Sequence, residues 1–164
     1  MTGPCLDDRI AVSLLFADTP DDGFPDYAAA ADALEAWLSE QGLVEVPVEV
    51  SGAELSRFLR LRDAVREILG ARVDGRAPDG SAVRIVEAAA LAAPGTPIGV
   101  WDGDGRVTRG WRSTGGDPLD RAAATIAADV VDLVVDHGDR LRRGAAGGTR
   151  FVLDGTGRGS AAAA

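Results

Sequence analysis

The chain has 164 residues, enough for one domain with its own core, and 46% of them are hydrophobic although only 5% are aromatic. The net charge of −9 at pH 7 disfavours nucleic acid as a partner of the whole domain, because an acidic surface repels phosphates. A single cysteine excludes an intramolecular disulfide and a multi-cysteine metal site, and the absence of a signal-peptide pattern and of a long apolar run predicts a cytoplasmic protein that does not span a membrane.

An apolar run and an acidic loop come before the first predicted helix. Residues 10–17 are apolar and carry no helix-capping residue, which favours a buried strand or an extended segment. Asp18 and Thr19 follow directly, and an acidic loop comes next. We interpret the carboxylates of that loop as solvated charge rather than as a cation site.

The first predicted helix extends from Asp26, which is placed as its N-cap, to about residue 41. Trp37 belongs to its inward face, and Gly42 stands where a glycine commonly ends a helix. Residues 43–50 alternate between apolar and polar like a strand. Pro47 restricts such a strand to a sheet edge, so a loop is the open alternative.

The stretch 51–73 predicts the central helix of the fold. Ser51 and Glu54 form a capping-box pattern, and apolar residues then recur every three or four positions. Arg57 and Arg60 fall on the polar face of this helix. Arg62 falls on the apolar face, where a buried guanidinium requires a partner.

A third helix and a hairpin follow the central helix. Asp79 or Ser81 is placed to cap a helix that ends at Pro94 and carries the apolar residues Val83, Ile85, Val86, Ala89, Ala90 and Leu91. The turn residues 102–105, which include two glycines, then separate two short runs rich in β-forming residues, as in a hairpin.

The last third of the chain predicts a fourth helix and a final strand. Asp117 and Pro118 form an N-cap and N1 pair, and the helix closes at His137. Residues 140–158 are rich in arginine, which we interpret as a solvated tail, although they include a strand at 149–153. Altogether we expect an α+β, mostly helical domain over residues 1–154, with about four helices packed around the central one, one β-hairpin, short flanking strands and a disordered tail at 155–164.

The order of these pieces resembles the ABATE domain, which is the N-terminal part of bacterial CGNR zinc-finger proteins. The resemblance rests on four segments. Phe16-Ala17-Asp18-Thr19 is similar to the family's "F-V-N-T", and Trp37-Leu38…Gly42-Leu43 to its "W-L…G-L". Leu59 to Arg66 is similar to its "L-R-x-L-R-x-A-L" helix, and Arg150-Phe151-Val152-Leu153-Asp154 to its "W-L-F-L-D" strand. The family's cysteines would fall near Gly144 and Gly148, and its Cys-Gly-Asn-Arg segment has no counterpart. We therefore expect the zinc-finger segment to be missing and a structural zinc site, which needs about four ligands, not to form.

The resemblance implies a stress-induced transcription regulator with a helical, ligand-sensing domain. Candidate ligand-binding residues are Asp18, Thr19, Trp37 and Arg62, with a small anionic ligand held by the guanidinium. The alternative for Arg62 is a structural ion pair with Asp18, which we favour. Trp101 and Trp111 on the hairpin provide a surface for a homodimer, although packing on the domain's own helices is the simpler interpretation.

A second functional hypothesis is a regulator that contacts DNA through the arginine-rich segment, with Arg140, Arg142 and Arg143 as the binding residues. Catalysis is a third. The sequence contains no nucleophile–base pair, no phosphate-binding glycine loop after a strand and no metal-ligand constellation. We therefore expect a protein that is not an enzyme and that carries no cofactor and no metal.

Overall fold

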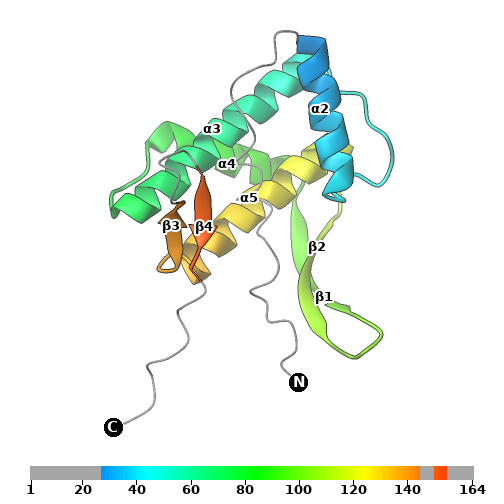
Figure 1. The fold of residues 1–164 in the computed structure, drawn as a ribbon. Coiled ribbons are helices and arrows are strands. Elements are labelled where there is room, and N and C mark those ends of the chain that lie inside the picture. Colours follow the sequence, from blue (N-terminus) through cyan, green and yellow to red (C-terminus); the bar gives the residue numbers. More distant parts are fainter. Residues whose placement is uncertain (1–26, 145–149, 155–164) are drawn as a thin grey trace.

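Four helices and two antiparallel strand pairs make up the residues that the structure, a computed structural model, describes, namely 27–144 and 150–154 (Figure 1). In chain order the elements are α2 (Tyr27–Glu40), α3 (Gly52–Asp74), α4 (Gly80–Ala92), β1 (Gly95–Trp101), β2 (Val107–Ser113), α5 (Pro118–Asp136), β3 (Leu141–Arg143) and β4 (Phe151–Leu153). The predicted α+β, mostly helical class is confirmed. The apolar run at 10–17 and the tail at 155–164 lie outside the described residues.

The central helix α3 begins and ends where its sequence predicts. The Ser51 hydroxyl accepts a hydrogen bond from the amide of Glu54 at 3.3 Å, and the Glu54 carboxylate accepts one from the amide of Ser51 at 2.7 Å. This is a complete capping box, which satisfies two amides that would otherwise lack partners. At the other end Gly75 has a φ of +66°, a conformation that favours glycine and closes the helix.

Carboxylate caps also begin the next two long helices. At the start of α4 the N-cap is Asp79 rather than Ser81. The Asp79 carboxylate accepts a hydrogen bond from the amide of Ser81 at 3.1 Å. At the start of α5 the Asp117 carboxylate accepts from the amide of Asp120 at 2.9 Å, and Pro118 occupies the first helical position. The sequence signals for these helix starts are local, and all three act as predicted.

The hydrophobic core lies where α3 packs against its neighbours. Phe58, Val65 and Leu69 of α3 are no more than 1% exposed, and α5 contributes Ile126 and Val130 at similar burial. The helix α4 packs against both α3 and α5, while α2 lies across the beginning of α3 (Figure 1). Burying apolar side chains of this size supplies most of the stabilisation of such a domain.

Of the two alternatives for residues 43–50, the structure contains the loop. The amide of Val50 bonds to the carboxylate of Glu35 on α2, at 2.7 Å. Leu91, one of the apolar residues of the predicted third helix, is 75% exposed. It stands one position from the end of α4, where the chain turns towards β1.

The predicted hairpin is present and longer than expected. β1 and β2 pair antiparallel from Gly95 opposite Ser113 to Trp101 opposite Val107, and in Figure 1 the pair extends away from the helices. Trp101 is 69% exposed. The interpretation that it packs on the domain's own helices is therefore wrong for Trp101, whereas the side chain of Trp111 lies outside the described residues. A homodimer stays a prediction.

The described part of the arginine-rich segment contains a pair of short strands. Leu141–Arg143 forms β3, which pairs antiparallel with β4, so the final strand is confirmed and the interpretation of this whole segment as a solvated tail is wrong. Leu141 and Phe151 are buried, and β3 packs on α3. Two inward-facing side chains were enough to bring the strand pair onto the core. Within the described ranges no helix is both long and apolar enough to cross a membrane.

Candidate functional site

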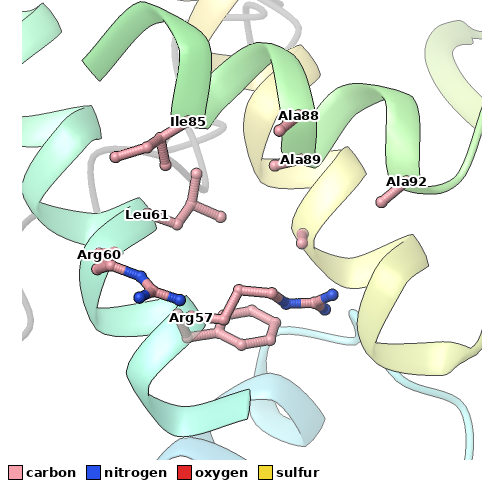
Figure 2. A pocket seen from close by; sticks show the side chains of 9 residues that line it. Arg57, Arg60, Leu61, Ile85, Ala88, Ala89 and Ala92 are labelled. Carbon is pink, nitrogen blue, oxygen red and sulfur yellow. The ribbon is translucent and has the colours of Figure 1, made fainter. Parts of the chain in front are cut away.

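A cavity of about 450 Å³ lies between α3, α4 and α5 (Figure 2). It exists because the facing positions on α4 and α5 are alanines, which leave room that larger side chains would fill. The residues that line it are Arg57, Phe58, Arg60, Leu61, Ile85, Ala88, Ala89, Ala92 and Ala123. Ala88 and Ala92 are exposed, so the cavity opens to solvent along the α4 edge.

Arg57 crosses the cavity from α3 towards α5 (Figure 2). Its Nη1 donates to the Asp120 carboxylate at 2.6 Å, and its guanidinium carbon lies 5.6 Å from the centre of the Phe58 ring. The ion pair joins two residues 63 positions apart and so ties α3 to the first turn of α5. The Nε atom of Arg57 is buried and has no hydrogen-bond acceptor within residues 27–144 and 150–154.

Arg60 is the second guanidinium of the cavity. It is exposed, and it forms no ion pair or hydrogen bond with any residue in the part of the chain that the structure describes. No acidic side chain lines the cavity itself. The site therefore combines an apolar interior with two cationic donors, one of them already shared with Asp120.

The polar groups of the cavity lining are limited to the two guanidinium groups. The nine lining residues include no nucleophile and no side chain that titrates near neutral pH, since both polar members are arginines. Across the described ranges, no three histidine, cysteine or acidic side chains gather closely enough to hold a metal ion.

Two of the four residues predicted to bind a ligand, Arg62 and Trp37, lie outside the cavity lining. Arg62 is 6% exposed on α3, as its position on the apolar face predicts, and its Nη2 lies 3.4 Å from the Asp63 carboxylate. Trp37 is half-buried on α2 and packs against the core. Neither lines the cavity. Asp18 and Thr19 lie outside the described residues, so a ligand site formed by these four residues stays a prediction.

The arginines predicted to bind DNA make contacts within the domain. Arg140 donates from Nε to the backbone carbonyl of Asp154 at 2.9 Å, and Arg142 donates from Nη1 to two backbone carbonyls of its own turn. Arg143 pairs with the Asp74 carboxylate at 2.9 Å, which joins β3 to the end of α3. These side chains hold the strand pair in place. Their role in DNA binding stays a prediction.

The sequence reasoning missed Arg57 and Arg60 as site residues. It placed both on the polar face of α3, although Arg57 is half-buried at the cavity. Two signals were available: the spacing of three residues between the arginines, which puts them on one side of the helix, and the run of alanines at 88–90 on the following helix. Neither signal shows by itself that the two surfaces face each other.

The molecule is a helical domain with an open cavity that is lined by two arginines. Residues 9–137 match the ABATE family, described as a putative stress-induced transcription regulator. The match covers well over half of the chain, and the protein belongs to the ABATE family. The matched segment contains every residue that lines the cavity and ends before Arg140. A comparison with curated proteins gives no match.

A group of electrostatic contacts joins α3 to the connection between α3 and α4. The Glu67 carboxylate accepts two hydrogen bonds from the Arg76 guanidinium, at 2.6 and 2.8 Å, and one from the amide of Asp79 at 3.1 Å. These bonds, the Arg76 bonds above all, lower the pKa of Glu67 from its ordinary value of 4.5 to about 2.

This lowered pKa predicts how stability changes with pH. Because the folded pKa lies below the unfolded one, the stabilisation is fully present above pH 4.5 and is lost as the pH falls towards 2. Glu67→Gln should therefore be less stable than the wild type at pH 7, and the difference should shrink between pH 4.5 and 2. Urea denaturation at a series of pH values measures this. Glu87→Gln, at an exposed α4 position, is the control and should leave the pH dependence unchanged; an equal response of both variants would contradict the prediction.

Proposed function

We propose that this chain is a non-enzymatic, ligand-sensing domain of a cytoplasmic transcription regulator, and that it binds a small molecule in the cavity between α3, α4 and α5. The observation that carries the proposal is the cavity itself, with its apolar walls and its two guanidinium groups. A volume of about 450 Å³ lies within the range of small-molecule sites, which is roughly 300–1,000 Å³. The family description supports a regulatory role.

The position of the cavity suits a sensing function. Its walls come from three helices, and the Arg57–Asp120 ion pair spans two of them. A ligand that bonds to Arg57 therefore acts on the contact between α3 and α5. A ligand shifts the balance between two arrangements of helices only if it binds one arrangement more tightly than the other. The Arg57 guanidinium, which both Asp120 and a bound ligand contact, provides such a difference in affinity.

Direct DNA binding through the arginine-rich segment is the alternative. Arg140, Arg142 and Arg143 are each engaged by backbone or carboxylate oxygens of the domain, which leaves fewer donors for phosphates. The net charge of −9 also opposes association with DNA. Both observations favour ligand binding over DNA binding for this chain.

A thermal-shift screen tests the proposal. The full chain is heated in the presence of small organic acids, amines and neutral apolar compounds at millimolar concentration. A ligand at about a hundred times its Kd adds about 2.7 kcal/mol to stability, which for a chain of this size corresponds to a rise in Tm of about 5–10 °C. If no compound raises the Tm while low-salt duplex DNA binds, the ligand-sensing proposal is wrong and the alternative takes its place.

A further inference from the structure

The cavity's polar groups define the charge of what it binds. Both are donors, because an arginine side chain offers N–H groups and no acceptor. The Nε of Arg57 is buried without an acceptor within residues 27–144 and 150–154, and Arg60 forms no ion pair there. Because this Nε has almost no accessible surface, the donors that a ligand oxygen can reach are those of the exposed Arg60 side chain and of the accessible part of the Arg57 guanidinium.

The two lining arginines and Asp120 together carry a single positive charge. Arg57 and Arg60 each carry one positive charge, and Asp120, at 2.6 Å from Nη1 of Arg57, carries one negative charge. A dianion would leave negative charge uncompensated in a largely apolar cavity, and a neutral ligand would leave the positive charge uncompensated. A monoanion matches the site.

The rest of the lining defines the body of the ligand. Phe58, Leu61 and Ile85 supply apolar surface, and Ala88, Ala89 and Ala92 of α4 form a wall without bulky groups. Figure 2 shows these alanines on the side of the cavity opposite the two arginines. A ligand with its charge at one end and an apolar or aromatic body at the other fits both sides at once.

We propose that the cavity binds an organic monocarboxylate with a short apolar or aromatic body, whose carboxylate accepts hydrogen bonds from the guanidinium groups of Arg57 and Arg60. Asp120 keeps its bond to Nη1 of Arg57, on another nitrogen of the same guanidinium. A planar guanidinium can donate two parallel hydrogen bonds to the two oxygens of a carboxylate, which the point charge of a lysine ammonium cannot match in geometry. This proposal rests on the proposed ligand-binding function.

Isothermal titration of the full chain with four matched probes tests the ligand class: 3-phenylpropionate, 3-phenylpropanamide, 3-phenylpropylamine and phenyl phosphate. The carboxylate should bind at least about tenfold more tightly than the amide, since a charge-assisted hydrogen bond is roughly twice as strong as a neutral one, and the amine should bind most weakly. Arg60→Gln should reduce affinity for the carboxylate about tenfold and leave that for the amide unchanged. Arg84→Gln, an exposed α4 arginine outside the cavity, is the control and should change neither.

The outcomes separate this inference from the proposed function. Equal binding of carboxylate and amide, or tighter binding of phenyl phosphate or the amine, would overturn the monocarboxylate class while leaving a ligand-binding domain. Failure of all four probes, when the thermal-shift screen finds another ligand, would also overturn it. Failure of both the probes and the whole screen would overturn the proposed function itself. Because Arg60 is exposed, loss of folding does not obscure the result for Arg60→Gln.

Discussion

Replacing Phe58 by alanine is expected to lower the free energy of unfolding by about 3–5 kcal/mol. Phe58 is 1% exposed, it is among the largest fully buried side chains of the described residues, and its ring also forms part of the cavity wall. Removing the ring takes away apolar burial and leaves an enlarged void between α3 and α5, and each of these effects is destabilising. Urea denaturation followed by circular dichroism measures the change.

Leu91→Ala is the control for this prediction. Leu91 is 75% exposed on α4, so its truncation removes almost no buried surface and should change stability by less than about 0.5 kcal/mol. If Phe58→Ala costs no more than Leu91→Ala, the ring is not packed in the core, and the position assigned to the cavity would be wrong as well.

Filling the cavity is expected to abolish ligand binding without unfolding the protein. Ala89 is half-buried on α4 and lines the cavity, and its methyl group is among those that leave the space open. Ala89→Leu places a larger apolar side chain in that space, so its affinity for a ligand found in the thermal-shift screen should fall more than about tenfold. Because the new side chain enters an existing void, the Tm without ligand should stay within a few degrees of the wild-type value.

Ala36→Leu is the matched control for the filled cavity. Ala36 is exposed on α2 and does not line the cavity, so the same change of side chain there should leave ligand affinity unchanged. A ligand that binds Ala89→Leu as tightly as the wild type occupies a different site, and the assignment of the cavity would then be incorrect.

The helices could be predicted because their signals are local. The Ser51–Glu54 capping box and the Asp117–Pro118 pair each act within one turn of helix, and the structure contains both. The spacing of apolar residues likewise predicted that Arg62 is buried, because burial on a helix face follows from periodicity alone. The family resemblance rests on the same local segments, and the match over residues 9–137 confirms it.

Features that depend on distant partners could not be predicted in this way. Residues 43–50 alternate like a strand, but a strand requires a partner, and the amide of Val50 finds the carboxylate of Glu35 instead. The strand β3 was missed for the same reason, since its three residues carry two arginines and become a strand only by pairing with β4.

The cavity is the strongest example of a feature that a linear reading does not reveal. Its walls come from three helices, and its central contact joins Asp120 to Arg57, which was placed on the polar face of α3. An empty space between alanines leaves no pattern in the sequence, because alanine is equally common where helices pack closely. Only the mutual orientation of α3, α4 and α5 shows whether the alanines border an empty space or a close contact between helices.

A nitrogen-15 NMR titration of the full chain with 3-phenylpropionate tests the central claim, which is that this domain binds an organic anion between α3, α4 and α5. The account predicts shifts in the backbone signals of residues 57–61, 85–92 and 120–123, with little change at Trp37 and Arg62. Shifts confined to the region of Trp37 and Arg62 would instead support the site predicted from the sequence. An absence of shifts at millimolar ligand would contradict the account.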